Sequence, residues 1–339
     1  MGLEIHVVIK LENKLFLKYL MLSYEGGEIV SLSIALCTYN GGKYIVEQLQ
    51  SIAEQTILPD ELIICDDCST DETLACLHEF AKTAPFAVKI HINEKALGAI
   101  HNFEKAISLC QGEYIALSDQ DDVWLPEKIE KKLELMQASE KKNANIPILV
   151  HTDLCVVNAS LKVIKKSMMQ MQGIENERRY PFETLLAQNY VTGCTVLINK
   201  QLKELALPFP KAIVMHDWWL ALLAASNGKI AYLDEPTILY RQHGINAVGA
   251  KQYFSFNSIK RLLTVKEVTK RIQATILQAE SFAHYKPDIF LRGRSITVAY
   301  LQSLKQQKYH EIFALGIRKQ GFFRNLFFYI FLGFMKKQN

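Results

Sequence analysis

Between residues 30 and 118 the sequence alternates short apolar runs with stretches of helical periodicity, and few folds accommodate this alternation. The runs at residues 32–36, 61–65, 88–92 and 114–118 have the length and composition of buried strands. Between the first two runs, Ile45, Leu49 and Ile52 recur at helical spacing. Strands that alternate with helices predict a parallel sheet of right-handed βαβ units with helices on both faces.

The second half of the chain is less regular. It predicts strands at residues 148–153, 191–199, 229–233 and 237–240, and a helix at 217–226. Residues 161–180 are rich in Lys, Met, Gln and Arg and are predicted to form a mobile loop. The pattern beyond residue 250 is helical. We therefore divide the chain into an N-terminal extension (1–29), a main domain (30–250) and a helical C-terminal region (251–339).

Composition excludes several classes of protein. The formal charge of the 339 residues is only +4, and no basic stripe is interleaved with aromatic residues, so nucleic-acid binding is not expected. The seven cysteines are odd in number, irregularly spaced and mostly in apolar runs, which indicates a reducing compartment. Cys65 and Cys68 form a C-x-x-C without a second ligand pair, so no zinc or redox site is predicted.

Polar residues follow three of the predicted strands. Thr38 and Asn40 follow the first strand, Asp66 and Asp67 end the second, and an acidic cluster at residues 118–122 follows the fourth. Ligands of parallel α/β sheets bind beyond the carboxyl ends of the strands. A binding site at this edge of the sheet is therefore predicted.

The acidic cluster, Ser118-Asp119-Gln120-Asp121-Asp122, places three carboxylates in one turn. Like charges this close raise each other's pKa unless a positive group neutralises them. A hard divalent cation, which prefers oxygen ligands and often binds substrate phosphates, is the usual neutraliser. No G-x-G-x-x-G and no P-loop sequence is present, so a dinucleotide fold and a P-loop are not supported. The cluster predicts a metal–diphosphate site.

These segments, taken in order, resemble the inverting family 2 glycosyltransferases, which have the GT-A fold. The matching segments are residues 35–40, 63–71, 93–98 and 117–122, within a resemblance that covers about residues 31–250. Cys68 stands where the family commonly has Gly. The resemblance implies an α/β fold with a mostly parallel, Rossmann-like sheet flanked by helices, followed here by a helical C-terminal region.

The resemblance also implies a donor site. Asp66 and Asp67 would contact the base and ribose of a nucleotide-sugar, although both are also good helix-capping residues. The residues expected to line the same pocket are Thr38, Tyr39 and Asn40. Arg241 would pair with the diphosphate, although a surface ion pair would look the same in the sequence.

A metal site and a catalytic base follow from the same resemblance. Asp119 and Asp121 would hold Mg²⁺ or Mn²⁺ against the donor diphosphate, with His243 as the third ligand. Asp217 matches the acidic residue that accepts the proton of the acceptor hydroxyl as the hydroxyl attacks the anomeric carbon. His216 stands where the family often has Glu, and the sequence leaves its role open.

The acceptor side is less defined. Trp218 and Trp219 either stack on an acceptor sugar or belong to the core, because tryptophans at the start of a helix do both. Asp122 is a further candidate for acceptor contact.

Three segments, SDQDDVW, HDWW and YRQHGxN, resemble those of bacterial rhamnosyltransferase-like members of the family, which build O-antigen or capsule. This implies dTDP-rhamnose or a UDP-sugar as donor and a glycan or lipid-linked acceptor. The Gln-x-x-Arg-Trp signature of processive synthases is missing, which favours the addition of one sugar.

The C-terminal end carries an apolar, aromatic run with cationic flanks at about residues 318–337. It is too short to span a bilayer, so it predicts either an interfacial segment on an anionic membrane or a helix docked on the core. We expect a cytoplasmic protein that binds peripherally to the inner face of the cell membrane.

Three other functions remain as alternatives. A phosphohydrolase of the haloacid dehalogenase type also uses Asp-x-Asp, but its nucleophilic Asp follows the first strand rather than the fourth. A sugar nucleotidyltransferase would need a Gly-rich, basic first loop, which is not seen. An inactive binding module is disfavoured by the presence of Asp121, Asp217 and His243.

Overall fold

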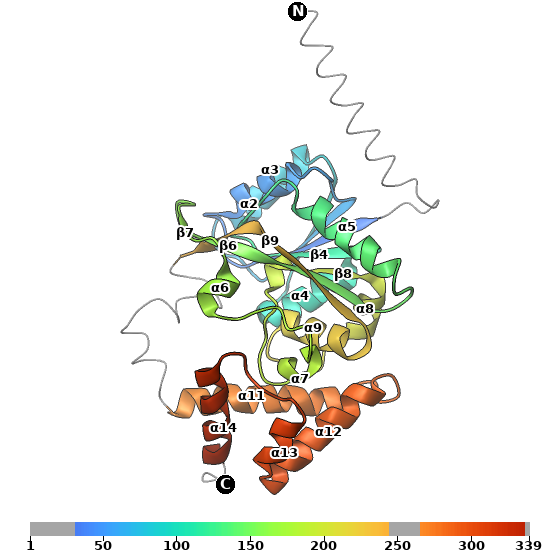
Figure 1. Cartoon of the computed structure of the whole chain (residues 1–339). Helices are drawn as coiled ribbons and strands as arrows, with labels where there is room; N and C mark the ends of the chain where they lie inside the picture. The colour runs from blue at the N-terminus through green and yellow to red at the C-terminus, as the bar shows by residue number, and fades with distance from the viewer. Residues whose placement is uncertain (1–30, 244–264, 336–339) are drawn as a thin grey trace, which may run out of the picture.

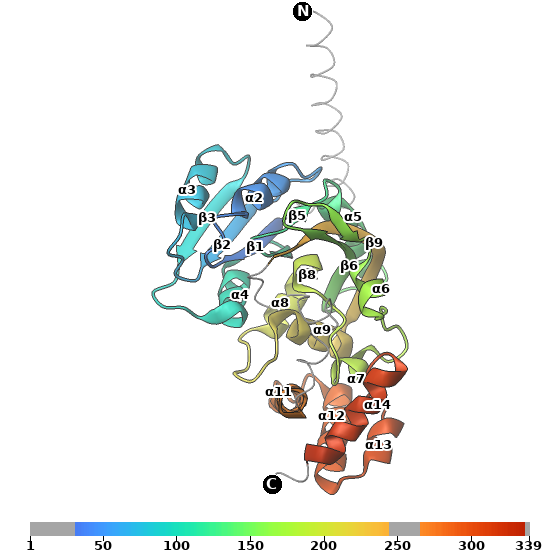
Figure 2. The same ribbon diagram turned by 90° about the vertical axis from the view of Figure 1, so that its left-hand side faces the viewer.

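The computed structural model describes residues 31–243 and 265–335. The predicted N-terminal extension (1–29) and the predicted boundary at residue 250 lie outside the described residues. A twisted sheet forms the centre of the molecule. Helices α2, α3 and α5 cover one face of this sheet, and α4, α8 and α9 cover the other (Figure 1). The C-terminal helices lie beyond the second helical layer (Figure 2).

The first half of the sheet is parallel, as predicted. Its strands are β1 (Leu32–Thr38), β2 (Glu61–Asp66), β3 (Ala87–Ile92) and β4 (Tyr114–Ser118). They pair in parallel in the order β3-β2-β1-β4. The helices between them are α2 (Ile45–Ala53), α3 (Thr73–Thr83) and α4 (Gly98–Leu109). All four predicted strands are thus present, and their polar carboxyl ends meet at one edge.

The second half of the sheet is mixed. Its strands are β5 (Val123–Trp124), β6 (Ile148–Asn158), β7 (Val163–Lys165), β8 (Leu197–Asn199) and β9 (Lys229–Gln242). The short strand β8 runs antiparallel to both β4 and β6, while β6 and β9 are parallel. The full order is β3-β2-β1-β4-β8-β6-β9-β5, with β7 on β6. The two predicted strands at 229–233 and 237–240 form one strand with a shift of register.

Two hydrophobic cores lie on opposite faces of the sheet because side chains of a strand alternate between its faces. On β1, Ile34 and Leu36 join the core under α2, α3 and α5, whereas Ala35 joins the core under α4. The second core continues into the C-terminal helices, where Phe282 and Tyr300 are fully buried. The C-terminal region therefore packs on the main domain through a shared core.

Two predictions from the irregular half are corrected. Residues 161–180 contain β7 and the short helix α6 (Met168–Gln172). Ser167 caps α6 by accepting a hydrogen bond from the Gln170 amide and itself donates to Asp153 on β6. The predicted strand at 191–199 is divided by a 3₁₀ turn, η1 (Gly193–Thr195), and only its end forms β8.

The remaining helices of the described chain support the site or form the C-terminal region. Those beside the sheet are α5 (Lys128–Glu140), α7 (Pro181–Leu185), α8 (Lys200–Ala206) and α9 (His216–Asn227). Those of the C-terminal region are α11 (Val265–His284), α12 (Leu291–Gln306), α13 (Tyr309–Ala314) and α14 (Phe322–Met335). Within the described ranges, no helix combines the length and apolar character needed to cross a membrane.

Candidate active site

The turn after β1 is tied to the end of β2 by hydrogen bonds. The Thr38 hydroxyl donates to Asp66 Oδ1 over 2.7 Å, and Ser69 donates to Asp66 through its hydroxyl (2.6 Å) and its amide (2.8 Å). Asn40 has a positive φ of 48° and accepts a 2.8 Å bond from the Thr70 amide. Asp66 is fully buried. These contacts do not support its predicted contact with the donor, because both carboxylate oxygens bind protein groups that shape the turn.

Ser69 and Glu72 have the spacing of a capping box, but the structure does not form one. Glu72 is the N-cap residue of α3, and its side chain makes no capping hydrogen bond. The Ser69 hydroxyl instead binds Asp66 and accepts a 2.8 Å bond from the Asn40 amide. Ser69 is therefore part of the turn between β1 and β2.

Asp67 stabilises the start of α4. Its carboxylate accepts hydrogen bonds from the Leu97 and Gly98 amides at 2.7 and 2.9 Å and from Asn93 Nδ2 at 2.8 Å. A carboxylate at a helix N-terminus is favoured by unpaired amides and by the helix dipole. The capping role anticipated as an alternative is therefore present, on α4, and the predicted ribose or base contact stays a prediction.

Gln120, which the sequence analysis did not single out, joins the acidic cluster to the turn after β1. Its side-chain amide accepts from the Tyr39 amide (2.8 Å) and donates to the Tyr39 carbonyl (3.0 Å). A Cβ on Gly41 would lie 2.2 Å from Gln120 Oε1, so only glycine fits there without moving this side chain. Tyr39 itself is 56% exposed beside this junction. Its ring is therefore available to a ligand.

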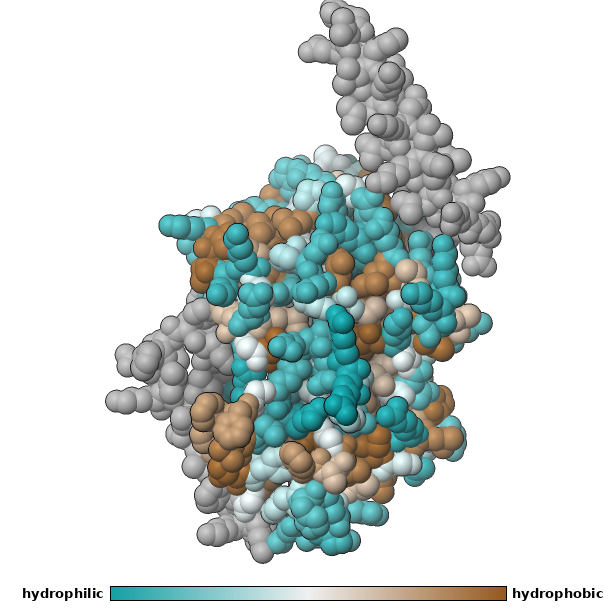
Figure 3. All heavy atoms as spheres, viewed as in Figure 1, coloured by the Kyte–Doolittle hydropathy of each residue, from teal (hydrophilic) through white to brown (hydrophobic). Residues whose placement is uncertain are grey.

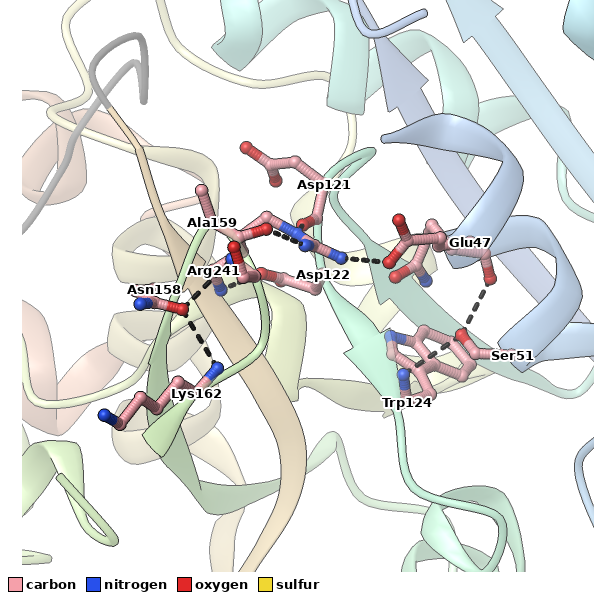
Figure 4. A network of polar contacts seen from close by, with 11 residues as sticks. Glu47, Ser51, Asp121, Asp122, Trp124, Asn158, Ala159, Lys162 and Arg241 are labelled. Carbon is pink, nitrogen blue, oxygen red and sulfur yellow. Dashed lines mark hydrogen bonds and ion pairs between the residues drawn. The ribbon is translucent and has the colours of Figure 1, made fainter. Parts of the chain in front are cut away.

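Arg241 on β9 organises the other side of the acidic cluster (Figure 4). Its guanidinium donates to the carbonyls of Asp121 (2.9 Å) and Ala159 (2.6 Å) and forms a 2.6 Å ion pair with Glu47 on α2. Its backbone amide donates to Asp122 Oδ1 over 3.1 Å. The side chain is only 1% exposed. The guanidinium therefore holds the loop, and the predicted diphosphate contact stays a prediction.

Two of the predicted metal ligands are in contact. His243 Nε2 lies 2.8 Å from Asp121 Oδ2. Asp119 does not complete a compact triad with them: among described residues, the one group of potential ligands with atoms within 4.8 Å of one another is Asp119, Asp122 and Cys194. A buried thiol is a soft ligand that suits Mg²⁺ poorly.

Burial raises the pKa values of all three carboxyl groups in the cluster, and repulsion by neighbouring carboxylates adds to the shift of Asp119 and Asp122. Burial, then the charges of Asp121 and Asp217, raises the pKa of Asp119 to about 7. Burial also raises the pKa of Asp121, although its bond with His243 opposes the shift. The pKa of Asp122 is raised well above its usual range, and Asp122 is fully buried. Asp122 therefore does not support its predicted acceptor contact.

Asp217 lies in the first turn of α9, close enough to Asp119 for the two charges to interact. Its carboxylate accepts hydrogen bonds from Asn189 Nδ2 (3.2 Å) and from the Trp218 amide (2.6 Å). Burial raises its pKa to about 7, although these bonds and one from the Gly193 amide oppose the shift. A carboxylate with this pKa is suited to accept a proton near neutral pH.

The two tryptophans beside Asp217 belong to the core. Trp219 is fully buried, and its indole nitrogen donates to the Ala206 carbonyl over 3.4 Å. Trp218 is 9% exposed and donates to the Leu185 carbonyl over 2.6 Å. Of the two roles anticipated, the core role is the one observed for Trp219. A stacking role for Trp218 is not supported by this burial.

His216 is also buried. Its ring stacks on Phe103 with centroids 3.9 Å apart, and burial lowers its pKa to about 3. A Cβ on Gly193 would lie 2.8 Å from His216 Nε2. His216 is therefore a neutral packing residue that seats α9 against α4 and η1, beside Asp217.

A second residue that the sequence analysis did not single out is Lys128 on α5. It is fully buried, its ammonium donates to the Cys194 carbonyl over 2.6 Å, and it lies 4.5 Å from the centre of the Trp124 ring. Its charge lowers the pKa of both Asp119 and Asp122. The signal was present in the sequence, because Lys128 falls on the same helical stripe as Ile129 and the other buried residues of α5.

Comparisons with known proteins give a consistent result. Residues 33–205 match the family model described as glycosyl transferase family 2. The chain is 32% identical over 305 residues to the dTDP-rhamnosyl transferase RfbG of Shigella flexneri, which covers 83% of this chain and 97% of that protein. It is 35% identical over 105 residues to the putative teichuronic acid biosynthesis glycosyltransferase TuaG of Bacillus subtilis, covering 31% of this chain and 41% of that protein.

Among solved structures, the chain is similar to S. aureus TarS 1-349 in complex with UDP-GlcNAc, with a TM-score of 0.52 and 17% identity over 80% of this chain and 72% of that one. At this identity the likeness concerns the fold alone. It confirms the predicted GT-A-like α/β fold with a helical C-terminal region, in which the sheet is mixed where a mostly parallel one was predicted. From its family model and its relatives, the chain belongs to glycosyl transferase family 2 and is rhamnosyltransferase-like.

Proposed function

We propose that this chain transfers one sugar, with inversion, from a nucleoside-diphosphate donor to a glycan or lipid-linked acceptor of a bacterial surface polysaccharide. One observation carries the proposal. Asp119, partly buried beyond the end of β4, and Asp217, buried at the start of α9, interact electrostatically, and the carboxyl groups of both have a pKa of about 7. A metal-binding carboxylate on the donor side and a base on the acceptor side, at one sheet edge, are what a metal-dependent inverting transfer requires.

In this proposal the donor lies across the carboxyl ends of β1, β2 and β4. The exposed ring of Tyr39 would stack on the nucleobase of the donor, and Asn40 and Asp67 would lie beside the nucleotide. Asp66 and Arg241 fix the loops around it rather than bind the donor. The similarity to a dTDP-rhamnosyl transferase supports dTDP-rhamnose as donor, with a UDP-sugar as the second candidate.

We assign Mg²⁺ or Mn²⁺ to Asp119 and Asp121, with His243 as a further ligand. Carboxylate oxygens are ligands that suit a hard cation. Burial makes these carboxyl groups unfavourable as isolated anions, so a bound cation would compensate their charge. When bound, the cation would stabilise the charge that develops on the departing diphosphate. His243 holds Asp121 through its 2.8 Å contact, and Arg241 holds the Asp121 carbonyl.

Asp217 acts as the base. Asn189 and the Trp218 amide hold one carboxylate oxygen, Oδ1. The other oxygen can then accept the proton of an acceptor hydroxyl. We place the reaction at the cytoplasmic face of the membrane, where a lipid-linked acceptor would be found.

The replacement Asp217→Asn tests this role. It should lower the turnover number by about 100-fold or more, because general-base catalysis contributes at least that much, and leave donor binding unchanged. In the wild type, kcat/KM should fall as the pH drops below about 7, because only the deprotonated base accepts a proton. Transfer assays and thermal shifts with the donor measure these two effects.

Asp234→Asn is the matched control, because Asp234 is exposed on β9, where its carboxylate accepts a 3.1 Å hydrogen bond from the Tyr232 hydroxyl. This variant should turn over like the wild type. If Asp217→Asn instead abolished donor binding, Asp217 would belong to the donor site and the assignment as base would be wrong.

A further inference from the structure

Helix α14 exposes an apolar face. Its outward residues are Phe322, Phe323, Leu326, Phe327 and Ile330, with exposed fractions of 76%, 71%, 44%, 49% and 42%. They recur at the spacing of one helical face. Figure 3 shows apolar side chains gathered over α14, at the lower left of the molecule. Soluble surfaces seldom carry so many large apolar side chains side by side unless the patch binds something.

Helix α14 is firmly packed on the rest of the protein, so its outward face is defined. The opposite face of α14 is packed into the core through Phe328 and Leu332, which are 2% and 3% exposed. The Tyr329 hydroxyl donates to the Ile317 carbonyl over 2.6 Å, and Arg324 donates to the carbonyls of Gln172 and Gly173. Docking by one face fixes which side chains point outward.

The neighbouring helix α13 extends this apolar surface. Phe313 is 62% exposed, and its ring lies 6.1 Å from that of Tyr329 on α14. The surface, defined here as Phe313 together with the five outward residues of α14, thus spans two helices.

Positive charge gathers at the N-terminal end of α14. Burial, and then the nearby charges of Arg271 on α11 and Arg324 on α14, lower the pKa of Lys319 to about 8. Arg318, next to Lys319 in the sequence, has its guanidinium carbon 4.9 Å from the centre of the Tyr180 ring. Aromatic and aliphatic side chains beside clustered basic groups are complementary to the acyl chains and headgroups of an anionic leaflet.

We propose that this apolar surface is the membrane-docking site of the protein and that its partner is an anionic lipid bilayer. This docking site rests on the proposed function in one respect: a lipid-linked acceptor would bring the protein to a membrane. A protein partner or a second copy of the chain would also cover apolar groups. The basic cluster beside them favours the lipid, because a second copy would bring like charges together.

Vesicle binding tests the proposal with the full chain and without donor or turnover. The chain should sediment with vesicles containing phosphatidylglycerol and bind phosphatidylcholine vesicles more weakly, and salt at about 0.5 M should reduce the difference through screening. The variant Phe322→Ser/Phe323→Ser/Phe327→Ser should lower the partition coefficient by about tenfold or more, because three large apolar groups are removed from the contact.

The control is Val163→Ser/Ile164→Ser on β7, where the replaced side chains are 51% and 46% exposed away from α14. This variant should bind vesicles like the wild type. Equal binding by the triple Phe variant, or no binding by the wild type, would overturn the proposal. A lipid-free dimer that the triple variant loses would show self-association instead.

A fluorescence measurement reports the contact directly. The three tryptophans of the chain, at positions 124, 218 and 219, are buried, so brominated lipids should leave their emission unchanged. Phe323→Trp should be quenched by brominated vesicles, and Ile164→Trp should not. Quenching of both, or of neither, would contradict docking through α14. Asp217→Asn should bind vesicles like the wild type, so failed docking and a failed catalytic assignment are distinguishable.

Discussion

At the scale of single residues, the proposed site is defined by carboxyl groups whose charged form is poorly solvated in the folded chain. Asp119 and Asp217 are held where ionisation is unfavourable, and each has a pKa near 7 instead of the ordinary 3.8. Such groups destabilise the folded chain when charged unless a ligand compensates them. Burial is the main cause for both groups, and for Asp119 the charges of Asp121 and Asp217 add to it.

The replacement Asp119→Asn measures this destabilisation. Because the folded-state pKa of Asp119 is raised from 3.8 to about 7, the folded chain binds a proton there that the unfolded chain releases. The free energy of unfolding therefore decreases as the pH rises from about 4 to about 7. Without divalent cations, the variant should melt about 2 °C or more above the wild type at pH 8, since a gain of about 1 kcal/mol produces such a shift.

The pH series provides the control for that prediction. At a pH of about 4 the wild-type carboxyl group is protonated in the folded state, so the difference in melting temperature should largely vanish. A constant difference at every pH would mean that Asp119 is not the group that titrates. Adding Mn²⁺ should stabilise the wild type more than the variant.

At the scale of elements, α5 supports the site from beneath the sheet. Lys128 and Lys132 are fully buried one turn apart, and their ammonium groups donate to the carbonyls of Cys194 and of Thr195 and Val196. These carbonyls belong to η1 and the residue after it. Since the Gly193 amide of η1 also binds Asp217, α5 is linked to the proposed base through one turn.

Lys128→Met should therefore weaken both stability and turnover. It leaves the buried Cys194 carbonyl without its donor, at a cost of about 1–3 kcal/mol, and removes a positive charge close to Asp119 and Asp122. We expect lower kcat and a kcat/KM profile displaced to higher pH, because the acidic groups lose a charge that favours their ionisation. Chemical denaturation and pH-dependent kinetics measure the two effects.

Lys131→Met is the matched control on the same helix. Lys131 is partly exposed, and its ion pairs with Glu127 and Glu235 lie at the surface, where such pairs contribute little. The control should retain wild-type turnover and pH dependence. If Lys128→Met lost stability but kept an unchanged pH profile, Lys128 would be a structural residue alone.

The sequence predicted elements well where periodicity is strong and poorly where tertiary contacts decide. The strands β1, β2 and β4 were found because each is a buried apolar run. The helix α6 was missed because it depends on Ser167 and on Asp153 of a distant strand. The burial of Arg241 was missed for the same reason: its partners come from three separate segments.

At the scale of the whole molecule, the two cores on opposite faces of the sheet support different parts of the protein. One core, under α2, α3 and α5, carries the turns after β1 and β4, and the other joins α9 to the C-terminal helices. The order of polar strand ends was readable from the sequence, so the place of the site was predicted. Which polar groups face a ligand was not, because exposure depends on partners such as Gln120 that pair only in the folded chain.

In the proposed function, the sheet edge binds a nucleoside diphosphate-sugar together with a divalent cation. A thermal-shift panel of nucleoside diphosphates and their sugar conjugates, each with and without Mn²⁺, tests it most directly, since a ligand selective for the folded state raises its stability. We expect dTDP- or UDP-linked species to raise the melting temperature of the wild type only when Mn²⁺ is present, and Asp121→Asn to lose this response. A wild-type melting temperature that no member of the panel changes, with or without the cation, would contradict it.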